Sequence, residues 1–329
     1  MGLAWATVTI PGAVTKKWYG CASDSDGSNL IAAARDSNVY ISTNSGTTWV
    51  TATIPGAATK SYRSCASDDD GSVLLAVAAD TDRVYLSTNS GTTWVTATIP
   101  GPATGEWQSC ACDSDGSVLM AVNTGGNAYI STNSGTTWVT ATIPVGMTPN
   151  IYRGCTCDSD GSVLLTIIGN AGVGFSYIST NSGTTWATVT TIPGAAIKDY
   201  RNCASNSDGS ILTTGVVNGY TYISTDTGTT WVTATIPGNT ISHCDIDSDG
   251  SNLIAIAYNR GTYISTDTGT TWVTATIPGT TAKNYRGCAS DDDGSVLLAC
   301  VDTGSVYMGI TTSDVTGFPV YLMQQSDID

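Results

Sequence analysis

Residues Ser42–Pro55 have the sequence STNSGTTWVTATIP, and close copies of this phrase stand at Ser87–Pro100 and Ser131–Pro144. Three variants follow, beginning at Ser179, Ser224 and Ser265. Aligned cysteines mark seven repeats with a period of about 44 residues, at Cys21, Cys65, Cys110, Cys155, Cys203, Cys244 and Cys288. A period of this length indicates an array whose core is shared between neighbouring units.

One repeat contains four short strand-forming segments. They are Tyr62–Ala66, Val73–Ala78, Arg83–Leu86 and Thr93–Ile99, rich in Val, Thr, Tyr, Ile and Trp. Clusters of Asp, Asn, Ser and Gly between them are typical of turns, and no segment has a helical period. Four strands per repeat predict an all-β protein, a seven-bladed β-propeller of four-stranded antiparallel blades.

The two ends of the sequence predict how the ring closes. Trp5–Gly12 matches Trp186–Gly194, the last strand of a repeat, whereas the seventh repeat loses the phrase after Tyr307. We therefore expect the N-terminal strand to complete the seventh blade and remove an open sheet edge. Residues 1–310 form the predicted propeller, and residues 311–329 form a tail that packs in cis or pairs with another subunit.

The phrase resembles the Asp-box, or BNR repeat, of sialidase-like propellers, and the resemblance covers nearly the whole chain. It implies a structural turn between the third and fourth strands of a blade, remote from any active site. The matching residues are Ser42, Asn44, Gly46, Trp49, Ser87, Asn89, Gly91, Trp94, Ser131, Asn133, Gly135, Trp138, Ser179, Asn181, Gly183, Trp186, Ser224, Asp226, Gly228, Trp231, Ser265, Asp267, Gly269 and Trp272.

The residues of a sialidase active site are not evident. Such a site needs three arginines, a tyrosine nucleophile paired with a glutamate, and an aspartic acid. Arg63, Arg153, Arg201 and Arg286 each follow a tyrosine, yet they recur at one repeat position, and Glu106 is the only glutamate. We expect a non-catalytic protein without a cofactor, and keep a sialidase-like hydrolase as an alternative.

The charges are expected to separate between the two faces of the disc. The sequence has 12 Lys and Arg, 27 Asp and Glu and a net charge of −15. The blade topology predicts all 12 bases at one end with six acids, and 18 aspartates without a base at the other. Opposite charges favour head-to-tail contact between copies, whereas the alternative is that the acids only maintain solubility.

These features lead to the predicted function, a structural or interaction module that self-assembles head-to-tail or by strand exchange. The assembly tail would use Phe318, Val320, Tyr321 and Leu322. The alternative is a lectin-like disc that binds glycans or surface proteins through its basic, variable face. Its binding residues would be drawn from Trp18, Tyr19, Tyr62, Arg63, Trp107, Tyr152, Arg153, Tyr200, Arg201, Tyr285 and Arg286.

The sequence also bears on nucleic-acid binding, membrane insertion and location. The acidic composition argues against a nucleic-acid partner, and no apolar run has transmembrane length. The first residues, MGLAWATVTIPG, do not form a recognisable signal peptide. We expect an extracellular, surface- or particle-associated protein and leave a cytoplasmic location open.

Two further residue patterns concern metal binding and disulfides. Asp245, Asp247 and Asp249 have the DxDxDG spacing of a calcium loop, but an ordinary Asp/Gly hairpin turn is the preferred interpretation. The seven aligned cysteines occupy one position in every repeat, so we expect buried core thiols rather than disulfide pairs.

Overall fold

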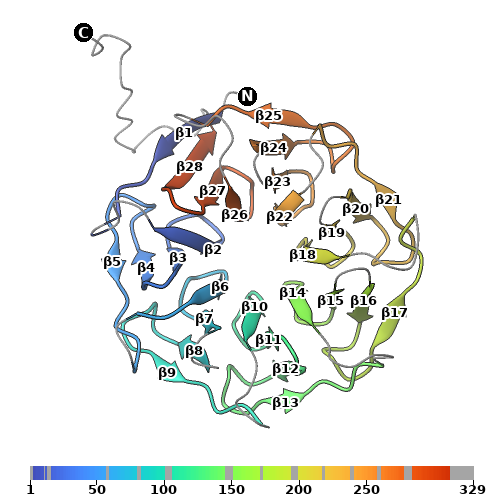
Figure 1. The fold of residues 1–329 in the computed structure, drawn as a ribbon, viewed down its shortest axis with the longest axis horizontal. Helices are drawn as coiled ribbons and strands as arrows, with labels where there is room; N and C mark the ends of the chain where they lie inside the picture. Colours follow the sequence, from blue (N-terminus) through green and yellow to red (C-terminus); the bar gives the residue numbers. More distant parts are fainter. Residues whose placement is uncertain are drawn as a thin grey trace.

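The computed structural model describes residues 3–10, 12, 16–56, 59–79, 83–100, 106–144, 151–170, 173–193, 199–216, 219–237, 241–257, 261–277 and 284–311. The described chain is all β, and seven four-stranded antiparallel sheets form a ring around a central axis (Figure 1). The predicted seven-bladed propeller is confirmed. No helix in these residues is long and apolar enough to cross a membrane.

Each blade runs from an inner strand at the axis to an outer strand at the rim. Blades one to three are β2 (Lys17–Ser23), β3 (Leu30–Arg35), β4 (Val39–Ser42) and β5 (Val50–Thr51); β6 (Tyr62–Ser67), β7 (Leu74–Ala78), β8 (Arg83–Ser87) and β9 (Val95–Thr96); and β10 (Trp107–Cys112), β11 (Leu119–Asn123), β12 (Ala128–Ser131) and β13 (Val139–Thr140). Blades four and five are β14 (Tyr152–Cys157), β15 (Leu164–Asn170), β16 (Val173–Ser179) and β17 (Ala187–Val189); and β18 (Tyr200–Ser205), β19 (Leu212–Val216), β20 (Thr221–Ser224) and β21 (Val232–Thr233). Blades six and seven are β22 (Ile241–Ile246), β23 (Leu253–Ala257), β24 (Gly261–Ser265) and β25 (Val273–Ala275); and β26 (Tyr285–Ser290), β27 (Val296–Val301), β28 (Val306–Thr311) and β1 (Leu3–Thr7).

The hydrophobic core lies between neighbouring blades. Strand β7 is buried along its whole length because it is covered on both faces. Its apolar side chains divide between two clusters, since Leu74 and Ala76 pack with Ile31 of blade one, whereas Leu75 packs with Leu119 of blade three. All seven aligned cysteines are buried thiols, as predicted, so each blade depends on its neighbours for a complete core.

The N-terminal strand closes the ring, as predicted. Strand β1 pairs antiparallel with β28, and Tyr307 lies opposite Thr7. In blade one Tyr40 lies opposite Thr51, so β1 has the same register as the fourth strand of a complete repeat. Strand β28 extends to Thr311, one residue beyond the predicted boundary, and the assembly tail with Phe318, Val320, Tyr321 and Leu322 lies outside the described residues.

The predicted fourth strand was too long. Thr93–Ile99 was expected, but only Val95 and Thr96 are paired in β9. Trp94 belongs to the preceding turn, where its indole donates to the Gly91 carbonyl at 3.1 Å. The last bond to the sheet is donated by Ala97 to Val84 at 2.9 Å, after which the chain leaves the sheet.

Hairpins between the first and second strands join in a closed ring of backbone hydrogen bonds. Each hairpin donates one N–H to the next and accepts one from the previous hairpin, over 2.8–3.0 Å. The bonds from backbone N–H to backbone carbonyl run, in order, from Ser25 to Asp69, Asp69 to Ser114, Ser114 to Ser159, Ser159 to Ser207, Ser207 to Ser248, Ser248 to Asp292, and Asp292 to Ser25. We call these residues the hairpin ring, and it tightens one end of the axis.

Candidate binding site at the basic end of the axis

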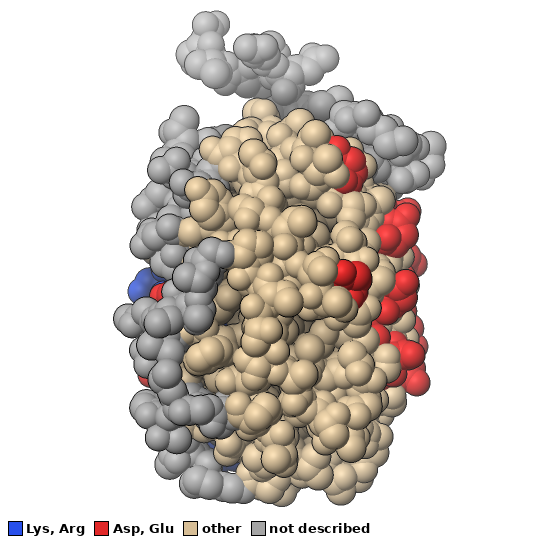
Figure 2. All heavy atoms as spheres, turned by 90° about the vertical axis from the view of Figure 1, so that its right-hand side faces the viewer, with Lys and Arg blue, Asp and Glu red and all other residues tan. Residues whose placement is uncertain are grey.

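The described charges separate between the two faces of the disc. Ser45, in the turn before β5, donates its N–H to Ser28 of the hairpin at 2.9 Å, so turn and hairpin share one face. The described hairpins and turns on this face contain aspartates but no Lys or Arg. Figure 2 accordingly shows acidic side chains gathered along one edge of the disc, whereas the Lys and Arg side chains in view lie at the opposite edge beside an acidic one. The end of the axis opposite the hairpin ring is therefore the basic end.

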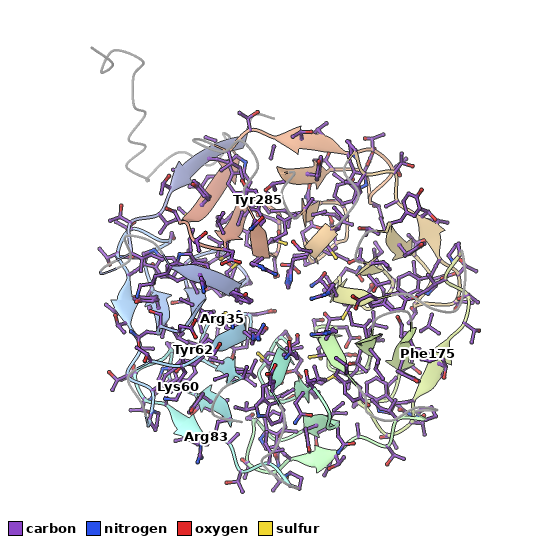
Figure 3. The ribbon with its side chains drawn as sticks, viewed as in Figure 1. Arg35, Lys60, Tyr62, Arg83, Phe175 and Tyr285 are labelled. Carbon is purple, nitrogen blue, oxygen red and sulfur yellow. The ribbon has the colours of Figure 1, made fainter. Side chains whose placement is uncertain are left out.

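Four arginines stand at the same place near the start of their inner strands. We call Arg63, Arg153, Arg201 and Arg286 the arginine cluster. In each of these strands the register shifts between the two residues that flank the arginine, so the arginine lies outside the regular ladder. Nitrogen-bearing side chains gather around the central axis in Figure 3, which labels Arg35 beside it.

Tyr19 occupies the corresponding position of blade one and brings three guanidinium groups together. Its ring centroid lies 5.7 Å from Arg35, 5.3 Å from Arg63 and 5.1 Å from Arg286. The Tyr19 hydroxyl also accepts a hydrogen bond from Arg35 at 3.2 Å. Arg35 was not among the predicted binding residues, because it lies on a second strand and only the fold brings it to the axis.

Carboxylates pair with most of these arginines. Arg286 lies 3.0 Å from Asp302, and Arg201 lies 3.5 Å from Asp199. Looser pairs join Arg35 with Asp36 at 3.8 Å and Arg63 with Glu106 at 3.9 Å. The three longer pairs are partly exposed and contribute little stability, about 0–1 kcal/mol each, whereas the Arg286–Asp302 pair is more buried. All four set the local charge.

Arg153 differs because no carboxylate of the described chain pairs with it. Its Nε donates to the Gly169 carbonyl at 3.4 Å, and its terminal nitrogens make no hydrogen bond with described residues. Burial lowers the pKa of Arg153, and the nearby charge of Arg201 lowers it further. Arginine nevertheless remains charged at neutral pH, so the site carries an uncompensated cation.

The predicted aromatic stacking surfaces are not available, with the exception of Tyr19. Trp18 is 1% exposed and Trp107 is 4% exposed, and both belong to the core between blades. The tyrosines that precede the arginines are buried as well: Tyr62, Tyr152, Tyr200 and Tyr285. The prediction that these rings bind a ligand was wrong, because the start of each inner strand needs a large side chain to fill the space between blades.

The residues of the Asp-box-like phrase form a turn on the acidic face. Ser42 Oγ accepts the Gly46 N–H at 2.9 Å, and Asn44 Oδ1 accepts the Thr48 N–H at 2.8 Å. In the next blade, Gly91 has a positive φ of 75°, and a Cβ there would lie 2.1 Å from Ile41 Cδ1. Sequence predicted a turn between third and fourth strands, and its place opposite the arginine cluster agrees with a structural role.

The three aspartates of the predicted calcium loop have separate hydrogen-bond partners. Asp247 Oδ1 accepts the Asn252 N–H at 2.9 Å, and Asp249 Oδ1 accepts the Ser251 N–H at 2.7 Å. Asp245 instead reaches the next blade and accepts the Ser290 N–H at 2.9 Å. No group of three acidic, histidine or cysteine ligands is assembled within the described ranges, so calcium binding stays a prediction.

No known protein-family profile matches the sequence, and no curated protein is significantly similar to it. Solved structures do share the fold. YCF48 bound to a D1 peptide has a TM-score of 0.69 and 13% sequence identity, and the match covers 93% of this chain and 97% of that one. YCF48 from Cyanidioschyzon merolae has a TM-score of 0.68 and 13% identity, with 95% of this chain and 100% of that one covered. The GH74 xyloglucanase from Xanthomonas campestris has a TM-score of 0.71 and 17% identity, with 92% of this chain and 53% of the xyloglucanase covered. At these identities the likeness shows the seven-bladed propeller fold alone.

Proposed function

We propose that the protein is a non-catalytic interaction propeller that binds an acidic partner surface at the basic end of its axis. The observation that carries this proposal is the arginine cluster, in which Tyr19 brings Arg63 and Arg286 together and Arg153 has no carboxylate partner among the described residues. A folded surface of this kind favours encounter with an acidic partner through its long-range field. Support for a protein partner comes from the similar fold of YCF48, whose structure holds a D1 peptide.

Self-assembly follows as the first form of this function, because each copy also carries an acidic face (Figure 2). Contact between the basic face of one copy and the acidic face of the next is heterologous and need not close. Strand exchange through the tail is the other route to a polymer.

Sedimentation velocity across a salt series tests this form. We expect assemblies at about 20 mM salt that dissociate at about 500 mM, because the Debye length falls from over 20 Å to under 5 Å. Assemblies that do not change with salt concentration, but are lost when the chain is truncated after Thr311, would instead support strand exchange. A monomer at low salt and high concentration, with or without the tail, would refute self-assembly.

An acidic segment of another protein is the second candidate partner. It is favoured by the position of the arginine cluster at the end of the axis, where a peptide is reached by residues from several blades. Fluorescence anisotropy with acidic, neutral and basic peptides of equal length tests it, and only the acidic peptides should bind.

The proposal that the protein is not an enzyme is tested with a fluorogenic sialoside and with xyloglucan. We expect turnover of neither substrate.

A further inference from the structure

We infer that Arg153, together with Arg201, forms a subsite for one carboxylate group of the ligand. This inference rests on the proposed function and identifies where in the arginine cluster the acidic partner is held. Arg35, Arg63 and Arg286 each pair with a carboxylate of their own, so they are partly neutralised before any ligand arrives. At blades four and five, Arg201 pairs with Asp199, whereas Arg153 pairs with no described carboxylate. Two arginines there share the one paired carboxylate Asp199, which leaves one positive charge for an anion.

The position of the Arg153 side chain is fixed by the backbone around it. Gly169 lies below it, and a Cβ at Gly169 would stand 3.0 Å from Arg153 Cγ and 2.3 Å from the Tyr200 carbonyl. The same added atom would be 2.7 Å from Asp199 Oδ1. Only glycine allows this approach, so the stem of Arg153 and the Asp199 carboxylate share a tightly packed floor.

Hydrogen bonding leaves the functional end of the side chain free for a ligand. Nε is occupied by the Gly169 carbonyl, whereas the terminal nitrogens have no partner in the described chain. A guanidinium group presents its donors in a planar fork that matches the two oxygens of a carboxylate. Because Arg153 is half-buried, a carboxylate bound there loses less interaction energy to screening by solvent than one on an exposed arginine.

Arg201 supplies the second charge. Its carboxylate partner Asp199, 3.5 Å away, packs against the same Gly169 as the stem of Arg153, so the two arginines are neighbours. The charge of Arg201 accordingly lowers the pKa of Arg153. An incoming carboxylate would relieve the repulsion between the two arginines as well as pairing with Arg153. The ligand group is thus a carboxylate, from a protein side chain or from a free organic acid.

Isothermal titration calorimetry tests the subsite with two probes, a hexaglutamate peptide and free glutarate. Arg153→Gln keeps the length of the stem but removes the charge, and we expect it to weaken peptide binding about tenfold or more. Arg153→Lys keeps the charge without the planar fork, so its affinity for the peptide should lie between those of Arg153→Gln and wild type. Arg83→Ala is the matched control, because it removes one positive charge from an exposed side chain at the start of β8, away from the axis (Figure 3), and should bind like wild type.

The outcomes separate the subsite from the proposed function. Equal affinity of wild type and Arg153→Gln, with both folded by circular dichroism, overturns the subsite even if the peptide binds elsewhere on the face. The subsite also falls if neither probe binds wild type, while salt-sensitive self-association would still support the proposed function. Glutarate that binds as tightly as the peptide, and depends on Arg153, supports the subsite and identifies a free acid as its ligand.

Discussion

At the scale of single residues, the phrase uses Asn in some blades and Asp in others without changing the turn. Asn44 Nδ2 donates to the Thr48 hydroxyl at 2.8 Å, whereas Asp226 Oδ2 accepts from the Thr230 hydroxyl at 2.7 Å. A threonine hydroxyl is both donor and acceptor, so it reverses its role to suit the side chain. In both versions Oδ1 accepts the backbone N–H of the threonine four residues later.

Substitution of Asn44 tests this exchange. Asn44→Asp should change the free energy of unfolding little, because Thr48 can then donate instead of accept. Asn44→Ala removes the acceptor of the Thr48 N–H and should cost about 1–1.5 kcal/mol, since this N–H is exposed enough to be partly rescued by water. Urea unfolding of both variants measures the difference, and equal losses would contradict the hydroxyl exchange.

Asp245 gives a second prediction at this scale. Its pKa is raised to about 7, chiefly by burial, although the Ser290 N–H opposes the shift. The folded state then binds a proton more tightly than the unfolded state, so this group adds stability as the pH falls from about 7 to 4. His243, whose pKa burial lowers to about 4, acts in the opposite direction over part of this range.

The test therefore compares wild type with Asp245→Asn, which keeps an oxygen to accept from Ser290. Wild type should gain stability relative to the variant between pH 8 and pH 5, measured by urea unfolding. Parallel stability profiles over this range would show that the Asp245 carboxyl does not titrate with a raised pKa.

At the scale of elements, most strands could be predicted because their turns are chemically explicit. Asp68 illustrates this, since its two oxygens accept the Val73 N–H and the Ser72 hydroxyl, both at 2.9 Å, and so define the hairpin. The fourth strands were overestimated because Thr, Val and Ile continue beyond the last paired residue. Strand propensity alone does not show where the rim of a blade ends.

The closing strand β1 is the element on which the ring depends, and proline substitutions test it. The Val8 N–H donates to the Val306 carbonyl at 2.9 Å, so the N–H of Thr7, one residue earlier, faces away from β28. Val8→Pro removes this bond and should destabilise the protein by about 1–3 kcal/mol. Thr7→Pro is the control and should be better tolerated at this sheet edge; equal melting temperatures for the two variants would contradict the pairing.

At the scale of the whole molecule, the sequence predicted two charged faces but not the binding site in detail. The order of the strands shows at which end of the blade each connection lies. That assignment is sufficient to predict which face of the disc is acidic and which is basic. Which arginine lacks a partner depends on packing between blades. Arg153 lies over Gly169 of its own blade, at the point where Asp199 and Tyr200 approach from blade five. The aromatic residues misled the prediction because exposure at the start of a strand is decided by the neighbouring blade.

The hairpin ring should exchange its amide hydrogens as one unit. Each of its seven hydrogen bonds joins two blades, so opening one hairpin disturbs the blade on either side. We expect the amides of Ser114 and Ser159, far from the seam between β1 and β28, to exchange at nearly the same rate as Ser25 beside it. Hydrogen exchange by NMR measures these rates, and fast exchange confined to Ser25 and Asp292 would mean that the ring opens locally.

The same ring makes the starting point of the chain arbitrary. None of its bonds requires that two blades be consecutive in sequence, because the bond from Asp292 to Ser25 is equivalent to the other six. A gene rearranged to begin at another blade, with residues 1 and 311 joined by a linker, would encode the same set of contacts. Such circular permutants offer new ends at any blade boundary, and with them places to attach cargo around the rim while the arginine cluster stays intact.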